Sequence, residues 1–291
     1  MAARHGTTTT GREPGPTGPD GDLAAAVVAA HGALRAGRPL VACLTNEVVV
    51  QVTANALLAA GASPAMPRHP VEAAQLAGLS GGLLVNLGTV DDVQEDAAGR
   101  AVGAAAAAHV PWVLDPVAVG VLDHRTAIAR DLVRRAPTAV RGNASEVMAL
   151  AGVGAGGRGT DTTHGVDDAA AAAADLASTS GAVVAVSGKV DLVVAPDGRS
   201  LRVTGGSALG TRVTGFGCAL GGVVAAYLAT TPPEGDPLVA VAAAHAHVSA
   251  AAGRAAEGAR GPGSFAVAWL DELDAVTAED VAALVRPGAA A

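Results

Sequence analysis

The sequence predicts an α/β fold with a central, mostly parallel β-sheet and helices on both of its faces. Short, continuous runs of apolar and β-branched residues recur along the chain, as in strands that are buried on both sides. Alanine- and leucine-rich stretches of helical length separate most of these runs, which is the alternation typical of a parallel sheet. Half of the 291 residues are hydrophobic, which is enough to bury a sizeable core.

The N-terminal residues predict a tail that leads into one domain. Residues 1–20 are rich in Gly, Pro and Thr without apolar periodicity, so we expect a disordered tail. The stretch "LAAAVVAAHGAL" (23–34) indicates an amphipathic first helix and not a signal peptide, because it is short, is broken by His31 and comes after polar residues that include acids. No linker divides the rest of the chain, so we expect a single domain over 21–291.

Seven strands are expected along the chain, at 39–45, 81–88, 111–117, 138–143, 181–188, 190–196 and 200–204. Helices are expected between them, at 47–60, 90–109, 123–135 and 165–180. The sequence "PDG" between the last two strands is a turn signal, which predicts a hairpin there. The final third, 214–285, indicates helices only, with breaks at "TPPEGDP" and "RGPGS".

Composition argues against several classes of function. The net charge of −8 disfavours nonspecific binding to nucleic acid, and an aromatic content of 2% disfavours base-stacking platforms. No stretch suits a membrane span. The two cysteines, Cys43 and Cys218, show neither CxxC spacing nor a Cys/His ligand pattern, which argues against a zinc site or a disulfide scaffold. A cytoplasmic protein with reduced thiols is the simplest account.

Polar residues at the ends of the predicted strands are the candidates for function, because ligands of open parallel sheets bind beyond the carboxyl ends of the strands. These positions hold Thr45, Asn46, Asn86, Gly88, Thr89, Asp115, Arg141, Asn143, Glu146, Ser187 and Gly188. The set contains no Ser-His-Asp pattern and no nucleophile elbow. Its acids, amides and arginine suit magnesium and phosphate.

The stretch "VTGFGC" (213–218) precedes an apolar segment of helical length and allows two interpretations. It can place several backbone N–H groups at a helix N-terminus, where Gly215 and Gly217 would let an anionic oxygen approach. Alternatively, it is a tight loop with Cys218 as a packed thiol. It is not a Walker P-loop, because no GK[ST] comes after it, and it does not come directly after the first strand as a Rossmann fingerprint should.

Residues at the ends of two strands also have both a structural and a functional interpretation. Asn143 and Glu146 have capping-box spacing, with Asn143 as the N-cap of a helix. In the functional alternative, Glu146 holds a hydrated Mg²⁺ and Arg141 pairs with phosphate oxygens. Asp115 either simply ends its strand or faces a ligand.

Several motifs resemble those of the hydroxyethylthiazole kinase family. The longest is "LTNEVVVQVTANALLAAGASPAM" (44–66), which resembles the family's N-terminal signature. The stretches "LDPVAVG", "RGNASEVMALAG", "GVDD", "VAVSGKVDLV", "VTGFGCALGGVVAAY" and "GPGSF" occur in the family's order and spacing. The resemblance runs from about residue 39 to residue 275, which is nearly the whole predicted domain.

The resemblance implies a ribokinase-like fold and a kinase that uses ATP and Mg²⁺. Its substrate would be the primary alcohol of 4-methyl-5-(2-hydroxyethyl)thiazole, in salvage of the thiazole half of thiamine, and it would form trimers with active sites between subunits. It implies thiazole contacts at Met66, Gly215 and Asn46, ATP contacts at Arg141 and Ser187, and magnesium at Asp115 and Glu146. Cys218 stands where many ribokinase-like enzymes carry a catalytic aspartate. Since a helix N-terminus lowers a thiol pKa, we expect it to be partly thiolate.

Two positions depart from the family pattern. Glu47 stands where a tyrosine or an apolar residue is more usual, and Phe216 replaces the threonine of "TGTGC". The phenyl ring either narrows the site or points away from it. Other activities to weigh are another ribokinase-like alcohol kinase, such as a hydroxymethylpyrimidine kinase, a nicotinamide-hydrate dehydratase, or a non-catalytic relative. The 44–66 motif argues against the first two, and intact Asp115, Arg141, Glu146 and Gly215 argue against the third.

Overall fold

The computed structural model describes residues 19–153 and 165–288 and contains a nine-stranded sheet in the order β2-β1-β3-β4-β5-β6-β7-β8-β9. The strands are β1 (Leu40–Leu44), β2 (Ser63–Ala65), β3 (Gly82–Asn86), β4 (Trp112–Asp115), β5 (Ala139–Asn143), β6 (Val183–Ser187), β7 (Asp191–Val194), β8 (Ser200–Val203) and β9 (Val285–Pro287). The sheet is parallel from β2 to β6, and β7, β8 and β9 continue it antiparallel. The predicted mostly parallel sheet is confirmed.

All seven predicted strands form, and β7 and β8 pair as the expected hairpin. Its turn contains Gly198 in the left-handed region, at φ +86°, which glycine adopts without a Cβ penalty. The edge strands β2 and β9 were not predicted. Each has three residues, too few for a pattern, and β2 holds Pro64, which is tolerated at an edge.

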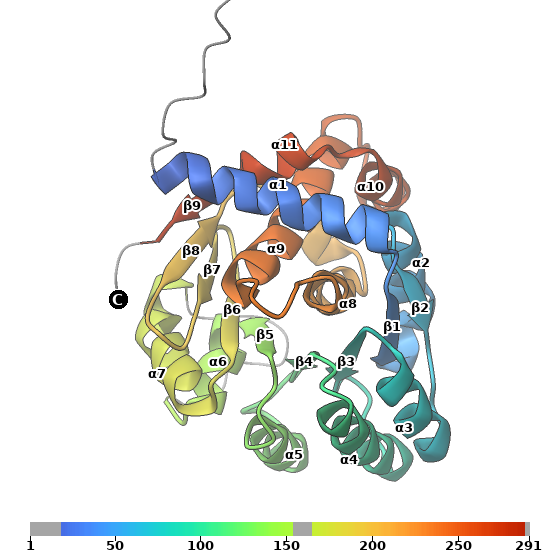
Figure 1. Cartoon of the computed structure of the whole chain (residues 1–291). Helices are drawn as coiled ribbons and strands as arrows, with labels where there is room; N and C mark the ends of the chain where they lie inside the picture. Colours follow the sequence, from blue (N-terminus) through green and yellow to red (C-terminus); the bar gives the residue numbers. More distant parts are fainter. Residues whose placement is uncertain (1–18, 154–164, 289–291) are drawn as a thin grey trace, which may run out of the picture.

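Helices cover both faces of the sheet (Figure 1). One face carries α3 (Pro70–Leu79), α4 (Asp92–Ala107), α5 (Asp123–Val133), α6 (Ala144–Leu150) and α7 (Ala170–Ser180). The other carries α1 (Pro19–Gly37), α2 (Val50–Ala60), α8 (Phe216–Ala229), α9 (Pro237–Glu257), α10 (Pro262–Ala275) and α11 (Ala278–Ala282). Single-turn helices η1 (Glu47–Val49), η2 (Asp167–Ala169) and η3 (Ala208–Arg212) complete the described elements.

Two hydrophobic cores therefore lie on opposite sides of the sheet. In β1, Val41 and Cys43 enter one core while Ala42 and Leu44 enter the other, since successive side chains of a strand point to opposite faces. This accounts for Cys43, which is 1% exposed and is a core residue. Both cysteines are free thiols, as expected.

Capping residues set where several helices begin. Asn143 caps α6: its side chain accepts from the N–H of Glu146, whose side chain accepts from the N–H of Asn143. The structural interpretation of Asn143 is confirmed. The side chain of Asp236 caps α9, which begins after the predicted break at the end of α8. In the two described ranges, every helix is too short or too polar to span a lipid bilayer.

Candidate active site

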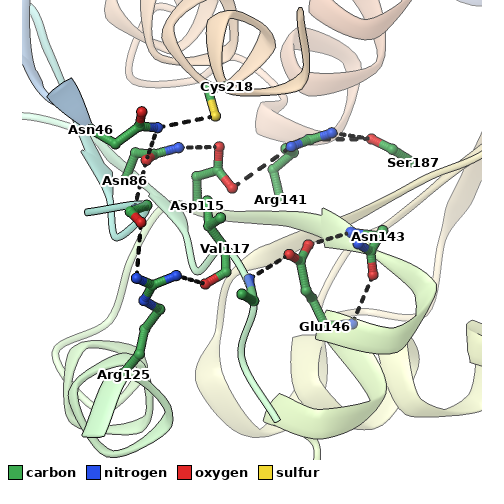
Figure 2. Close-up of polar contacts among 12 residues, drawn as sticks. Asn46, Asn86, Asp115, Val117, Arg125, Arg141, Asn143, Glu146, Ser187 and Cys218 are labelled. Carbon is green, nitrogen blue, oxygen red and sulfur yellow. Dashed lines mark hydrogen bonds and ion pairs between the residues drawn. The ribbon is translucent and has the colours of Figure 1, made fainter. Parts of the chain in front are cut away.

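Five neighbouring parallel strands each contribute one polar side chain to a continuous chain of contacts (Figure 2). Asn46 Nδ2 donates to Asn86 Oδ1 over 3.1 Å, and Asn86 Nδ2 donates to Asp115 Oδ2 over 2.7 Å. Asp115 Oδ1 lies 3.7 Å from Nη1 of Arg141. Nε and Nη2 of Arg141 donate to Ser187 Oγ over 3.2 and 3.1 Å. The carboxyl edge of the sheet thus carries an ordered polar row, as the strand-end positions predicted.

Cys218 joins this row from the helix above it. Its Sγ accepts a hydrogen bond from Asn46 Nδ2 over 3.4 Å, so the thiol lies next to the amide end of the row. Asn46 reaches this position because residue 88 is glycine. A Cβ on Gly88 would come within 2.5 Å of Asn46 Nδ2. The close approach of the loop after β3 therefore fixes the orientation of Asn46.

The pKa of Cys218 differs from the expectation. Burial, together with the nearby charge of Asp115, raises it to about 11, against a smaller lowering by Asn86, Arg141 and Asn46. The predicted partial thiolate is therefore wrong, because the thiol is protonated at neutral pH. Loss of hydration outweighs the favourable position in the first turn of α8.

Asp115 is fully buried and has an unusual protonation equilibrium. Burial raises its pKa from 3.8 to about 7, with the Arg141 charge opposing this rise and the Glu146 charge adding to it. Among the described residues, its Oδ1 has no hydrogen-bond partner. The Arg141 guanidinium, 3.7 Å away, is its ion-pair partner but lies too far to donate a hydrogen bond, so this oxygen can still accept a closer partner.

Arg141 lies between this carboxylate and the N-terminus of α8. Its side chain is 12% exposed, and a Cβ on Gly217 would come within 3.2 Å of its Nη2. Within the described part of the chain, the N–H groups of Gly217 and Cys218 have no acceptor, as expected for a first helical turn. A guanidinium beside free N–H groups at a helix N-terminus is a site for an anion such as phosphate.

Gly215 has a structural reason to be glycine. It lies in the left-handed region, at φ +89°, and a Cβ would come within 2.9 Å of Cγ1 of both Val49 and Val52. The loop therefore packs tightly on the start of α2. A side chain at 215 would collide with these valines. The sequence suggested a different reason for glycine here, namely that a side chain would block the approach of an anionic oxygen.

Glu146 is 5% exposed and has both carboxylate oxygens engaged by backbone donors. Oε1 accepts from the N–H of Ala118 over 2.8 Å, and Oε2 accepts from the N–H of Asn143 over 2.9 Å. Glu146 therefore caps its own helix and holds the loop after β4. Each oxygen keeps a second lone pair, so the structural role leaves room for contact with a hydrated metal.

Arg125, on α5, clamps that loop and was not singled out in the sequence. Its Nη1 donates to the carbonyl of Val117 over 3.2 Å, and its Nη2 donates to the carbonyl of Gly88 over 2.9 Å (Figure 2). Val117 and Ala118 have φ of +27° and +60°, which non-glycine residues adopt only when their surroundings enforce it. An arginine in a predicted helix usually indicates a solvated face, so no sequence signal distinguished Arg125.

Met66 lies outside the polar row and lines a cavity of about 60 Å³ beside it. The cavity is at the carboxyl ends of β1 and β2 and is also lined by Thr45, Glu47, Arg68 and Gln94 among others. Thr45 Oγ1 and Gln94 Oε1 are buried without a hydrogen-bond partner among the described residues. Two unsatisfied polar atoms in a small, partly apolar cavity indicate a site for a small organic ligand.

The two departures from the family pattern have clear positions. Phe216 points away from the polar row and stacks against Phe265 and Trp269 of α10, with ring centroids 6.2 and 4.8 Å apart. The ring therefore anchors α8 to α10 and does not narrow the anion site. Glu47 is at the rim of the cavity, where it pairs with Arg68.

The polar row fits magnesium that is bound together with a nucleotide. The described residues contain no cluster of three His, Cys, Asp or Glu side chains that would hold a metal on its own. Mg²⁺, however, usually keeps several waters and takes one or two carboxylates plus phosphate oxygens. Asp115 Oδ1, which accepts no hydrogen bond among the described residues, has the chemistry of such a ligand, and Glu146 is near enough for its charge to affect the pKa of Asp115.

Comparisons with known proteins show the family. The model of the hydroxyethylthiazole kinase family matches residues 32–279. A hydroxyethylthiazole kinase of Kineococcus radiotolerans is 57% identical over 260 residues, covering 89% of this chain and 93% of that protein.

Solved structures give the same result for the fold. The hydroxyethylthiazole kinase of Pyrococcus horikoshii has a TM-score of 0.81 at 34% identity, over 90% of this chain and 98% of that one. A ribokinase-like superfamily protein of Enterococcus faecalis has a TM-score of 0.58 at 12% identity, over 84% and 89% of the two chains, which shows the fold alone. The chain is a kinase with the ribokinase-like fold, and it belongs to the hydroxyethylthiazole kinase family.

Proposed function

We propose that the chain transfers the γ-phosphoryl group of ATP to the primary alcohol of 4-methyl-5-(2-hydroxyethyl)thiazole, in salvage of the thiazole half of thiamine. Family membership over residues 32–279 supports the substrate, and the polar row supports phosphoryl transfer. The observation that carries the proposal is Arg141, which lies against both the buried Asp115 and the free N–H groups that begin α8.

Arg141 and Ser187 bind ATP in this proposal. The guanidinium is held by Ser187 Oγ and faces Asp115, so its position is set before the nucleotide arrives. Burial lowers the pKa of Arg141, but the Asp115 and Glu146 carboxylates more than offset this and raise the pKa above its usual value. The arginine therefore stays charged and offers paired donors to phosphate oxygens.

The N-terminus of α8 receives the transferring phosphoryl group. Gly215 and Gly217 add no side chain to this turn, and the N–H groups of Gly217 and Cys218 have no acceptors of their own among the described residues. Phosphoryl transfer depends mostly on positioning and charge stabilisation, which fixed N–H donors and a fixed arginine supply.

Asp115 and Glu146 hold the magnesium. Asp115 would offer Oδ1, which accepts no hydrogen bond among the described residues, and Glu146, with both oxygens already accepting N–H groups, would contact the hydration shell of the ion. When bound, the ion neutralises charge on the phosphate oxygens during transfer.

The thiazole alcohol occupies the cavity lined by Met66 and extends towards Asn46 and Cys218. Met66 supplies an adaptable apolar contact, and Gly215 closes the loop side of the site. Asn46 and the protonated Cys218 thiol face the hydroxyl in this pose, with Asn46 bridging them to Asn86. Cys218 thus acts as the catalytic residue by contacting the hydroxyl, and the hydroxyl proton passes late in the transfer to an oxygen of the phosphoryl group that the hydroxyl attacks.

A homotrimer with active sites between subunits completes the proposal, in a cytoplasmic enzyme. Val48, 70% exposed, and Val50, at the rim of the cavity, are apolar side chains suited to a subunit contact there. The two free thiols support the cytoplasm as the location. A monomer with full activity in sedimentation experiments at micromolar concentration would contradict the shared site.

ATP turnover with and without the thiazole alcohol is the decisive experiment. We expect Mg²⁺-dependent ADP formation with hydroxyethylthiazole and none with hydroxymethylpyrimidine or without an alcohol. Turnover that survives complete chelation of divalent metal would contradict the magnesium assignment. Absence of ADP formation with every alcohol tried would favour a non-catalytic relative.

A further inference from the structure

His245 and Asp191 form a buried polar pair beside the nucleotide end of the polar row. His245, on α9, is 0% exposed, and Asp191, the first residue of β7, is 7% exposed. His245 Nδ1 lies 2.7 Å from Asp191 Oδ2. Because an ionised carboxylate only accepts hydrogen bonds, Nδ1 carries the hydrogen and donates it. The two side chains hold each other at a place where phosphoryl transfer itself requires no histidine.

The second oxygen of Asp191 fixes a turn. Oδ1 accepts from the N–H of Gly188 over 2.8 Å. Residues 188–190 connect β6 to β7, and Val186 and Leu192 are the last paired residues before this turn. The carboxylate therefore ties the start of β7 to the residue directly after Ser187. A shift of Asp191 would move Ser187 with it.

Ser187 passes this constraint on to Arg141. Its Oγ accepts two hydrogen bonds from the guanidinium, which in turn faces Asp115. These contacts form a continuous path from His245 on α9, through the turn after β6, to Arg141. Asp191 is also close enough to influence Arg141 directly, since its charge adds to those that raise the pKa of this arginine.

We propose that His245 is a positioning residue for ATP binding. It orients Asp191, which holds the 188–190 turn and thereby places Ser187 against Arg141. The inference rests on the proposed function in one respect, the assignment of Arg141 and Ser187 to ATP. His245 itself touches neither substrate in this account.

A matched control lies two residues away on the same helix. His247 is also 0% exposed, but its Nε2 donates to the carbonyl of Leu273 over 2.8 Å and its Nδ1 accepts from the Tyr227 hydroxyl over 3.1 Å. These partners belong to α8 and α10, and among the described residues their side chains form no hydrogen bond with the polar row. Loss of either histidine removes buried hydrogen bonds. In the part of the chain that the structure describes, only His245 is connected to Arg141 through hydrogen bonds, by way of Asp191 and Ser187.

The test compares His245→Leu with His247→Leu. We expect both variants to unfold at lower temperature than the natural chain, because each loses buried hydrogen bonds. Only His245→Leu should raise the KM for ATP, by about tenfold, with kcat and the KM for the thiazole alcohol nearly unchanged. His245→Asn should restore the KM, because its amide nitrogen can replace Nδ1 as the donor to Asp191. Equal KM values for ATP in the two leucine variants would overturn the proposal.

Two further variants keep the test decisive. Should His245→Leu fail to fold, Asp191→Ala is the alternative variant, because it removes the carboxylate that accepts from both His245 and the Gly188 N–H. An unchanged KM for ATP in Asp191→Ala would overturn the proposal. Ser187→Ala tests the ATP assignment by itself. If it raises the KM for ATP while His245→Leu does not, only the positioning role fails. If Ser187→Ala leaves the KM unchanged, the ATP assignment falls and the inference falls with it.

Discussion

Asn86 and Asp115 are paired in register at the ends of β3 and β4, and the Asn86 amide donates to the Asp115 carboxylate over 2.7 Å. Both side chains are 0% exposed. The amide oxygen of Asn86 accepts from Asn46 and from the N–H of Gly88, so its amino group must face Asp115. The Asn86 amide therefore connects Asn46, which bonds the Cys218 thiol, to the Asp115 carboxylate.

Asn86→Leu should move the acidic limb of the activity profile to higher pH. The Asn86 hydrogen bond is one of the contacts that lower the pKa of Asp115, so its loss raises that pKa further. Since the ionised carboxylate binds magnesium in the proposed mechanism, activity should then be lost at a higher pH as the solution is acidified. The measurement is kcat/KM for the thiazole alcohol against pH at fixed Mg²⁺. An acidic limb that stays in place would show that Asp115 does not control it.

The metal-free enzyme should become less stable as the pH rises through the range set by Asp115. The folded-state pKa of about 7 exceeds the ordinary value of 3.8, so the folded chain binds this proton more tightly than the unfolded chain. This contribution to stability is present below the unfolded pKa and is lost as the pH rises towards the folded pKa. Asp115→Asn should remove it.

Urea midpoints at about pH 5 and about pH 8, measured with a chelator, test this sign. The natural chain should lose more stability between the two values than Asp115→Asn does. Equal losses in both proteins would mean that Asp115 titrates near its ordinary pKa. Added Mg²⁺ should reduce the difference, because a bound cation favours the ionised carboxylate.

Much of the fold could be predicted because its signals are local. The seven longer strands lie in short, mostly apolar runs, and the hairpin at Gly198 and the capping box at Asn143 obey short-range turn and helix-start rules. The parallel order then brings Asn46, Asp115 and Arg141 to one edge, which the sequence also predicted. The strands β2 and β9 are too short to carry a pattern, and tertiary pairing alone defines them.

The parts that could not be predicted depend on contacts between distant residues. Arg125 holds the carbonyls of Gly88 and Val117, and nothing near it in the sequence marks that role. His245 meets Asp191 across 54 positions of the chain. The pKa of Cys218 depends on how deeply α8 buries the thiol and on the nearby Asp115, both of which are tertiary properties.

Cys218→Ala should lower kcat by less than about tenfold. With its pKa near 11, the thiol is protonated at neutral pH and offers little base strength, so its loss removes a contact to the hydroxyl and not a ready proton acceptor. Asn46 keeps its hydrogen bond to Asn86 in this variant, so the rest of the row should persist. The measurement is kcat with both substrates saturating. A loss of a thousandfold or more would assign the thiol an essential chemical step.

Gly217→Ala should raise the KM for ATP, and it tests the anion site more cleanly than any change at Gly215. The positive φ of Gly215 and its contacts with Val49 and Val52 mean that a side chain there would distort the loop itself. Gly217 carries no such backbone restriction, and its added methyl group would meet Nη2 of Arg141 at 3.2 Å. The guanidinium must then shift by a few tenths of an ångström from the place where we propose that it meets phosphate, which should cost up to about tenfold in kcat/KM for ATP.

Gly222→Ala is the matched control, because it adds the same methyl group to the same helix. Its Cβ would meet Leu57 and Thr53 at 3.3 and 3.4 Å, on the side of α8 that packs against α2. This variant should change stability slightly and leave the KM for ATP unchanged. If both variants give the natural KM, Arg141 either yields to the methyl group without loss or does not bind the nucleotide. Arg141→Lys separates these two explanations, since a lysine keeps the charge but loses the paired donors, and an unchanged KM there would remove Arg141 from the ATP site.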